Sequence, residues 1–242
     1  MKHVFVSVVI PAYNEDMVID MCLDSFVLQK TKHKFEVIIV DNNSTDNTYN
    51  LVKSYENKLN LKLIKEDQKG RGVARNTGFA HATGDIILST DADAIVPPHW
   101  IETLASYMEE KEGVYVAVTG SHIINDCSRF NNFLLNAFSP FLMDLHSIFF
   151  GHQWLSGYNF AVWKEVYVKT GGFRTDLNAL EDIDIGFKIN KLGKIKFLRS
   201  LNVISSGRRF KRGVFRVLFP RIYEVVACYL DRKRKFYLSD IR

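Results

Sequence analysis

The architecture of this chain is set by the segment Gly84-Asp85-Ile86-Ile87-Leu88-Ser89-Thr90-Asp91-Ala92-Asp93. Its apolar, β-branched run predicts a buried strand. Two carboxylates, Asp91 and Asp93, follow one residue apart at the strand end, where both can point into one crevice. Carboxylate oxygens are hard ligands, suited to Mg²⁺ or Mn²⁺ bound jointly with substrate phosphates. An ordinary surface turn is the alternative, and the apolar strand in front of the pair disfavours it.

Other apolar runs precede this segment and also predict strands, at residues 4–10, 35–40 and 61–64. Helical segments separate them, so strand and helix alternate. This alternation predicts an α/β fold with a mostly parallel, doubly wound sheet. Right-handed crossovers place the strand-end loops on one edge of such a sheet, where ligands bind. Tyr13, Asp41, Arg75 and Asp91 are therefore expected to converge there.

Some elements of the chain are predicted in more detail. The helix after the first strand is expected to turn Met17, Met21 and Phe26 inward. Residues 194–198 and 202–205 are expected to form two short strands. The aromatic stretch 130–150 predicts either a helix packed under a lid or a surface that meets lipid or an apolar acceptor.

Composition narrows the class of protein. A chain of 242 residues with 47% apolar residues is expected to form one domain, or a domain with a small appendage. Cys22, Cys127 and Cys228 show no metal or redox spacing, which indicates a reduced, cytosolic compartment. Neither a signal peptide nor a transmembrane helix is expected from the sequence.

Charge is concentrated at one end of the chain. Residues 207–242 carry eleven Lys and Arg against three acids, a net charge of +8, although the whole chain is only +5. This imbalance suggests a polyanionic partner. Because aromatic residues interrupt the basic ones, an anionic membrane surface on the cytosolic side is favoured. A helix packed on the catalytic domain is the alternative, and nucleic acid is disfavoured because no recognised binding module accompanies the charge.

Several blocks, taken in chain order, resemble the family 2 glycosyltransferases with the GT-A fold. These blocks are Ser7–Glu15, Val40–Asp46, Gly72–Gly78, Asp91–Asp93, Gly171–Phe173 and Glu181–Asp182. The resemblance implies a GT-A catalytic domain over residues 1–206, with a nucleotide-binding half (1–93) and an acceptor half (94–206). Residues 207–242 would form a basic, amphipathic C-terminal tail. The chain lacks the Gln-x-x-Arg-Trp motif of processive synthases, so repeated polymer synthesis is not expected.

The same resemblance implies roles for individual residues. Those lining the nucleoside pocket would be Pro11, Ala12, Tyr13 and Glu15. Asp41, in one motif with Asn43, would accept the imide N–H of the base, which favours uracil or guanine. Arg75 would lie near the base or the diphosphate. Asp91 would face the ribose and sugar, and Asp93 would ligate a Mn²⁺ or Mg²⁺ ion that bridges the diphosphate.

The acceptor side needs a base, because the attacking hydroxyl must lose its proton on the face opposite the leaving group. Asp182 is the candidate, with Glu181 orienting the acceptor, and in-line attack would invert the anomeric centre. The alternative for Asp182 is an acid in the first turn of a helix. Arg208 or Arg209 could bind the diphosphate or an acceptor phosphate, since arginine binds phosphate through two hydrogen bonds.

These features predict an inverting, metal-dependent glycosyltransferase that uses a UDP- or GDP-sugar, in the setting of cell envelope glycan synthesis. The expected acceptor is lipid-linked, either a polyprenyl phosphate or a growing saccharide, and the enzyme would be peripheral on the cytosolic membrane face. A soluble or protein acceptor is the alternative within the class. A non-catalytic nucleotide-sugar-binding subunit and a nucleotidyltransferase are alternatives from other classes. The latter would need a glycine-rich loop and a lysine where the chain has Pro11 to Glu15.

Overall fold

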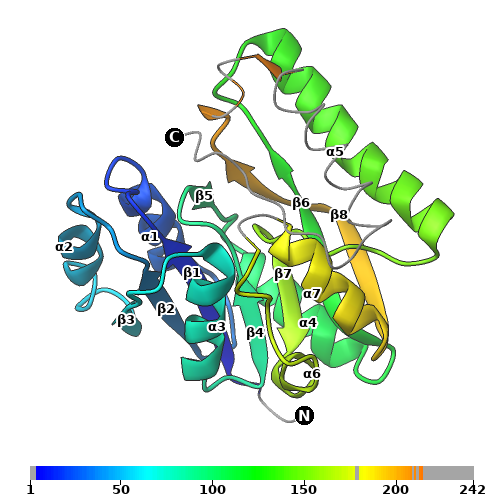
Figure 1. Cartoon of the computed structure of the whole chain (residues 1–242), viewed down its shortest axis with the longest axis horizontal. Coiled ribbons are helices and arrows are strands. Elements are labelled where there is room, and N and C mark those ends of the chain that lie inside the picture. The colour runs from blue at the N-terminus through cyan, green and yellow to red at the C-terminus, as the bar shows by residue number, and fades with distance from the viewer. Residues whose placement is uncertain (1–3, 178–179, 209, 211–212, 215–242) are drawn as a thin grey trace.

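The structure, a computed structural model, describes residues 4–177, 180–208, 210 and 213–214. These residues form one eight-stranded sheet in the order β3-β2-β1-β4-β7-β6-β8-β5 (Figure 1). The strands are β1 (Val6–Ala12), β2 (Phe35–Asp41), β3 (Leu61–Lys65), β4 (Ile86–Ser89), β5 (Ala94–Ile95), β6 (Tyr115–Ile123), β7 (Phe160–Trp163) and β8 (Lys194–Ser205). The helices are α1 (Ile19–Val27), α2 (Thr48–Lys53), α3 (Arg71–His81), α4 (Trp100–Glu110), α5 (Arg129–Phe150), α6 (Lys164–Lys169) and α7 (Glu181–Asn190).

The sheet is parallel in its first half and mixed in its second. Strands β3, β2, β1 and β4 run parallel to one another. Strand β7 is antiparallel to both β4 and β6, whereas β6 and β8 are parallel. The predicted α/β sheet is therefore confirmed, and β7 is the strand at which the two halves meet.

Helices cover both faces of the sheet, and alternate residues of β1 point to opposite cores. Ile10 packs in one core with residues of α1, α2 and α4, among them Phe26 and Trp100. Val9 packs in the other with residues of α3, α6 and α7, among them Phe79. A strand that is buried on both faces has to be apolar throughout, which explains the continuous apolar runs of β1 and β2.

Two strand pairings bring the loops at the carboxyl edge of the sheet close to one another. Ala12 pairs with Asp41, so the loops that follow β1 and β2 leave the sheet side by side. Farther along, Ala94 of β5 pairs with Ser205 of β8. Strand β5 begins directly after Asp93 and β8 ends shortly before Arg208, so this short antiparallel pairing brings those two residues into one neighbourhood.

The structure corrects some predicted details. Met17 and Met21 are exposed, at 83% and 48%, because α1 begins only at Ile19 and turns Phe26 and its neighbours inward. Strand β1 continues through Pro11 to Ala12, whose carbonyl accepts the Asn42 N–H. The two predicted short strands are one strand, β8, because a register shift opposite Gly120 and Ser121 accommodates the interruption.

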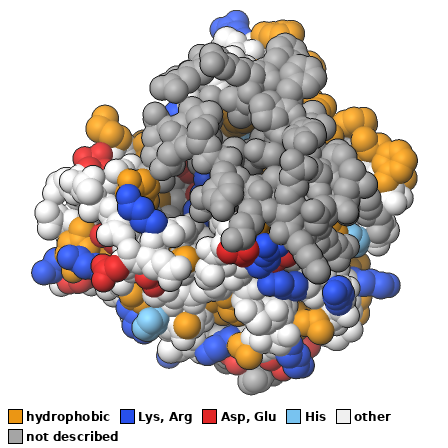
Figure 2. All heavy atoms as spheres, viewed as in Figure 1, with side chains coloured by type: hydrophobic (Ala, Val, Ile, Leu, Met, Phe, Trp, Pro, Cys, Tyr) orange, Lys and Arg blue, Asp and Glu red, His pale blue; other side chains and the backbone are white. Residues whose placement is uncertain are grey.

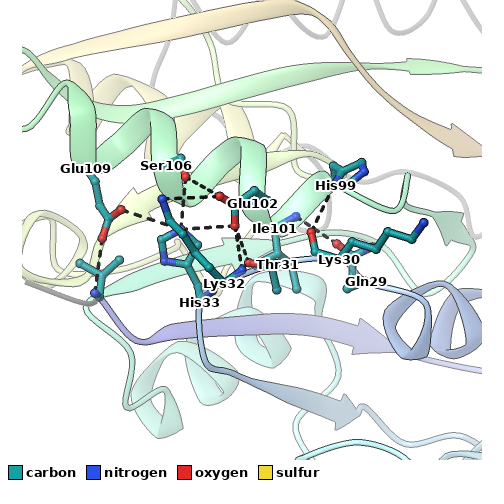
Figure 3. Close-up of polar contacts among 11 residues, drawn as sticks. Gln29, Lys30, Thr31, Lys32, His33, His99, Ile101, Glu102, Ser106 and Glu109 are labelled. Atoms are coloured by element: carbon teal, nitrogen blue, oxygen red, sulfur yellow. Dashed lines mark hydrogen bonds and ion pairs between the residues drawn. The ribbon is translucent and has the colours of Figure 1, made fainter. Parts of the chain in front are cut away.

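A polar clamp, formed by residues 29–33 with Glu102 and Glu109, fastens the loop before β2 to α4 (Figure 3). The Glu102 carboxylate accepts hydrogen bonds from the Thr31 hydroxyl at 2.9 Å and the Lys32 N–H at 3.0 Å. The buried His33 ring lies 3.7 Å from Glu102 and 3.8 Å from Glu109. This clamp precedes β2, so it stabilises the edge of the sheet opposite Asp91.

Helix α5 runs along one side of the molecule beside β6 and β8 (Figure 1). Ser128 caps its start by accepting the Asn131 N–H, and Gly151 ends it in the left-handed conformation at φ 70°. No helix within the described part of the chain is both long enough and apolar enough to cross a membrane. The predicted basic tail lies almost wholly outside the described residues.

Candidate active site

The loops after β1 and β4 border a pocket of about 440 Å³ at the carboxyl edge of the sheet. Its lining residues are Pro11, Ala12, Tyr13, Glu15, Asn42, Arg71, Ala74, Asp91, Ala92, Asp93 and Arg208. The pocket thus brings the loop after the first strand together with both aspartates of the Asp-x-Asp segment. We call it the donor-side pocket, after the role that is expected for these residues from the sequence.

Hydrogen bonds to residues that follow β2 fix the part of this pocket that is formed by the loop after β1. Asn14 takes the left-handed conformation, with φ 53°, and its side-chain oxygen accepts the Thr45 N–H at 2.8 Å. The Glu15 N–H donates to the Thr48 hydroxyl at 2.8 Å. Because the loop after β1 is tied to the loop after β2, Tyr13 and Glu15 are positioned by the sheet itself.

The residues of the second-strand motif differ in whether they line the donor-side pocket, and the roles of Asp41 and Asn43 in base binding stay predictions. Asp41 is buried and its carboxylate accepts the Ser44 N–H at 3.3 Å, but it is not among the residues that line the donor-side pocket. Asn43 is not among them either, and its side-chain amide donates to the Asp67 carbonyl. Asn42 lines the pocket instead, held through its side-chain oxygen, which accepts the Gly70 N–H at 2.8 Å.

Arg208 joins the two sides of the donor-side pocket. Its guanidinium lies 2.8 Å from the Glu15 carboxylate and 3.2 Å from that of Asp93. Partial burial opposes its charge, but Glu15 and Asp93 outweigh the burial and raise the pKa of Arg208 above its usual value. The other predicted arginine, Arg209, lies outside the described residues.

A second, larger cleft of about 1220 Å³ adjoins the first, and we call it the acceptor-side cleft. It is lined by Arg71, Arg75, Asp91, Asp93, His122, Ile124, Trp154, Leu155, Ser156, Gly157, Tyr158, Leu180, Glu181, Asp182, Ile183, Ser205, Ser206 and Phe210. Arg71, Asp91 and Asp93 line both spaces, so these side chains form the boundary between them.

Arg75 of α3 links Asp91 to two segments that are distant in the sequence, those of Gly157 and Glu181. Its side chain is almost fully buried and donates to Asp91 at 2.7 Å, to Glu181 at 2.6 Å and to the Gly157 carbonyl at 3.0 Å. Burial disfavours the Glu181 carboxylate, but Arg75 and Arg71 more than compensate and keep the pKa of Glu181 below its usual value. Through these three hydrogen bonds Arg75 positions the Asp91 carboxylate, and its place near the base or the diphosphate stays a prediction.

Asp182 lies in the first turn of α7. Its carboxylate accepts the Gly157 N–H at 3.1 Å and the Ile183 N–H at 2.9 Å. The second bond satisfies a free N–H at the helix start, so Asp182 does have the helix-terminal contact that was the structural alternative. It also lines the acceptor-side cleft, where a carboxylate can meet a substrate.

Gly157 is required by the close approach of these groups. A Cβ at this position would lie 2.9 Å from Arg75 Nη2 and 3.2 Å from the Asp182 carboxylate. Glycine therefore lets Arg75 and Asp182 both approach the same backbone segment closely.

Several lining residues were not found from the sequence. Arg71 opens α3 directly after the glycine of the Lys69-Gly70 turn, a position that could have been read as a cation at the site. Trp154 and Tyr158 flank Gly157 in the acceptor-side cleft, and the Tyr158 ring meets His122 edge-on at 4.5 Å. Burial lowers the pKa of His122 to about 4 and raises that of Tyr158 to about 12, so both rings are neutral at pH 7.

Asp91 and Asp93 offer the hard oxygen donors that Mg²⁺ and Mn²⁺ prefer. Within the described part of the chain, no group of three or more His, Cys, Asp and Glu side chains could hold a metal by itself. The donor set therefore fits an ion that is shared with substrate phosphates, and it does not fit a closed metal site made of protein ligands alone.

Comparison with known proteins identifies the family whose sequence model this chain matches. The family model for glycosyl transferase family 2 matches residues 7–170. The "Probable glycosyltransferase YdaM" of Bacillus subtilis is 30% identical over 198 residues, which cover 78% of this chain and 47% of that protein. The poly(ribitol-phosphate) β-N-acetylglucosaminyltransferase TarS of Staphylococcus aureus is 36% identical over 107 residues, which cover 43% of this chain and 19% of TarS. The chain thus spans less than half the length of these curated relatives.

Solved structures agree with the fold. S. aureus TarS 1–349 in complex with UDP-GlcNAc superposes with a TM-score of 0.65 at 22% identity, covering 83% of this chain and 58% of that one. The mannosyltransferase PcManGT from Pyrobaculum calidifontis, in complex with GDP-Man and Mn²⁺, superposes with a TM-score of 0.66 at 27% identity, covering 85% and 57%. At its level of identity, the TarS structure supports the fold alone.

Proposed function

The chain belongs to glycosyl transferase family 2, and from this premise we propose that it transfers a sugar from a UDP- or GDP-sugar to an acceptor, with inversion of the anomeric centre. One observation carries the proposal. The donor-side pocket and the acceptor-side cleft meet at Asp91 and Asp93, and Asp182 lines only the cleft. A donor and an acceptor could therefore approach each other across that boundary, with a base on the acceptor side.

The donor would lie in the donor-side pocket with its nucleoside against Pro11, Ala12 and Tyr13. Its diphosphate would lie towards Asp93, where Arg71 and Arg208 supply positive charge. A structural relative was solved with GDP-Man and Mn²⁺, which supports this donor class. Asp41 and Asn43 are still proposed to take part in recognition of the base. Neither lines the donor-side pocket, whereas Asn42, which lies between them in the sequence, does.

Bond breaking leaves negative charge on the departing nucleoside diphosphate and positive charge on the sugar. A Mn²⁺ or Mg²⁺ ion held by Asp93 and Asp91 together with the diphosphate would stabilise that leaving group. Arg208 would add a fixed positive charge on the same side. Arg75 holds Asp91 at 2.7 Å, which positions the carboxylate that separates donor from acceptor.

The acceptor hydroxyl would give up its proton to Asp182. Two backbone N–H groups orient that carboxylate, and the Gly157 N–H fixes it relative to Arg75. Glu181 is paired with Arg75 and almost fully buried, so its contribution to the acceptor would be indirect, through Arg75.

The acceptor proposed here is lipid-linked, either a polyprenyl phosphate or a lipid-borne saccharide on the cytosolic membrane face. The support is the apolar part of the cleft, where Ile124, Leu155, Leu180, Ile183 and Phe210 lie next to the polar boundary. A soluble saccharide would make little use of those side chains. A soluble or protein acceptor remains the alternative that the test below separates.

The experiment is a donor screen that measures release of free nucleoside diphosphate, with and without lipid extract. We expect turnover with one UDP- or GDP-sugar, stimulation by lipid extract, and loss of both activity and divalent-dependent nucleotide binding in Asp93→Ala. Full activity in EDTA would exclude the metal. Donor binding without any turnover, under every acceptor condition, would instead indicate a non-catalytic nucleotide-sugar-binding subunit.

A further inference from the structure

Helix α5 is apolar on both of its sides. Leu135 and Met143 are buried on its inner side. On its outer side Phe130, Phe133, Phe141 and Ile148 are exposed, between 56% and 78%, and Ala137 is exposed between them. We call these five residues the outer stripe of α5. Their spacing of three, four and seven residues places them on one face of the helix.

The outer stripe is unusual for a protein surface. A helix of this length extends about 33 Å, and soluble monomers rarely expose so long an apolar strip without a partner. In Figure 2, hydrophobic side chains gather along the upper right edge of the molecule, where α5 lies in Figure 1. A few scattered exposed apolar side chains would need no explanation, but an aligned stripe does.

The shape of this surface limits what can cover it. The inner side of α5 packs on the domain, so the helix lies flat on the surface and presents the outer stripe along its length. The helices of the described chain cannot cross a bilayer. A helix that is held flat by its own domain and that exposes Phe and Ile side chains suits the headgroup–acyl boundary of a membrane.

The charges around the stripe favour an anionic surface. Asp144 is the only acidic residue within 129–150, and Arg199 of β8 forms an ion pair with it. Arg129 is exposed at the start of the helix. Val214, which packs in one cluster with Leu135 of α5, leads into residues 215–242, where the sequence has seven basic and three acidic residues. Basic residues next to a membrane-facing segment are attracted to anionic headgroups.

From these observations we propose that the outer stripe of α5 docks the protein on a bilayer that contains anionic phospholipid. Phe133, Phe141 and Ile148 enter the headgroup–acyl boundary, and Arg129 at the start of the helix contacts lipid phosphates. Ile124 and Phe210 line the acceptor-side cleft and also pack beside Leu135 on the inner side of α5, so docking places that cleft about one helix diameter, roughly 10–12 Å, from the lipid surface. Only this last consequence rests on the proposed function.

The test uses the full chain without donor or metal. Its co-sedimentation is measured with vesicles of phosphatidylcholine, with and without phosphatidylglycerol. The wild type is expected to bind the mixed vesicles. Phe133→Ser/Phe141→Ser/Ile148→Ser is expected to lower the partition coefficient about 100-fold, because it removes three apolar side chains from the boundary. Leu28→Ser/Val114→Ser/Val168→Ser, a matched set that is 53–65% exposed on other elements, is expected to change it less than about twofold.

A second measurement reports directly how deeply the outer stripe enters the bilayer. Phe141→Trp should be quenched by lipids brominated in the acyl chains, whereas Val168→Trp should not. Binding of the stripe variant equal to wild type, or no binding of the mixed vesicles by the wild type, overturns the proposal. So does concentration-dependent self-association in sedimentation velocity that the stripe variant abolishes, since the stripe would then contact a second copy. Nucleotide binding is measured separately on every variant, so a failure of docking is not confused with a failure of the proposed function.

Discussion

The guanidinium of Arg208 lies 3.2 Å from the carboxylate of Asp93, the side chain proposed to ligate a divalent cation. The same guanidinium is 2.8 Å from Glu15, so one arginine pairs with two acids that line the donor-side pocket. A guanidinium beside the Asp93 carboxylate repels a divalent cation at the same carboxylate. Arg208 is therefore expected to weaken binding of the proposed metal ion when no nucleotide is present, and to be available to the diphosphate when the ion is bound.

Arg208→Gln should raise the affinity for Mn²⁺ measured without nucleotide. Removing one positive charge at this distance is expected to strengthen Mn²⁺ binding about tenfold in a partly solvated site. Electron paramagnetic resonance of free Mn²⁺ measures the effect. Arg199→Gln, which removes an exposed arginine on β8, is the control. Equal Mn²⁺ affinity in Arg208→Gln and wild type would show that Arg208 does not weaken metal binding at Asp93.

Asp182→Asn should lower the turnover number about 10²–10⁴-fold, the usual cost of losing a general base. Its donor KM should stay near that of the wild type, because Asp182 lines the acceptor-side cleft and not the donor-side pocket. The control is Asp184→Asn on the same helix, where the carboxylate pairs with Lys188 at 3.0 Å and is not among the lining residues. Normal turnover in Asp182→Asn, or a product with retained configuration, would contradict the assigned role.

Arg75→Met should destabilise the fold by about 3–5 kcal/mol, because it leaves the Glu181 and Asp91 carboxylates without their buried partner. Urea unfolding measures the loss. Glu181→Gln and the double variant complete a cycle, and the double variant should be less destabilised than the sum of the single ones. Arg174→Met is the matched control: Arg174 contacts Asp176 at 2.7 Å near the surface and should contribute about 0–1 kcal/mol. Similar losses for Arg75 and Arg174 would mean that the buried network is not strongly coupled.

Glu102 should make stability depend on pH in the acid range. Partial burial opposes its ionisation, but hydrogen bonds from the Lys32 N–H and from the Thr31 and Ser106 hydroxyls lower its pKa from 4.5 to about 2. A lowered pKa in the folded state adds stability above the unfolded pKa, and this stability is lost as the pH falls from about 4.5 to about 2. With allowance for solvent screening, Glu102→Gln should cost about 1–2 kcal/mol at pH 7.

The difference between wild type and Glu102→Gln in urea unfolding should shrink steadily below pH 4.5 and almost vanish near pH 2. Glu110→Gln, an exposed position on the same helix, should behave like wild type throughout. A cost that is independent of pH would assign the effect of Glu102 to packing instead of charge.

The sequence was most informative where local patterns decide the structure. Continuous apolar runs identified the parallel strands β1, β2 and β4, and the residues after each strand end do lie at one edge of the sheet. It was least informative about side chains at those ends. Whether Asp41, Asn42 or Asn43 faces the pocket depends on the alternation of the strand and on the left-handed conformation of Asn43, at φ 69°. If the strand ended one residue earlier or later, or if Asn43 had an extended conformation, a different one of these three side chains would face the pocket.

Contacts between segments that are distant in the sequence also could not be predicted. Arg75 and Glu181 are 106 residues apart, and neither residue type predicts the other as its partner. The motif that contains Arg75 suggested a contact with nucleotide, whereas the fold buries its guanidinium between three protein groups. Of the two arginines on α3, it is Arg71, one turn earlier, that lines the donor-side pocket. Which of two helical positions points to a ligand is decided by how the helix rotates on the sheet, and that depends on the whole core.

The pairing of β5 with β8 governs when the site can be completed during synthesis. Domains fold from the amino terminus as the ribosome adds about 5–20 residues per second. Ala94 leaves the ribosome long before its partner Ser205, so Asp93 waits on the order of ten seconds for the strand that leads to Arg208. From the synthesis of β6 until that of β8, the edge of β6 that β8 will occupy has no partner strand, and unpaired edges invite wrong pairings. That stage, late in translation, is the one at which a chaperone would contribute most.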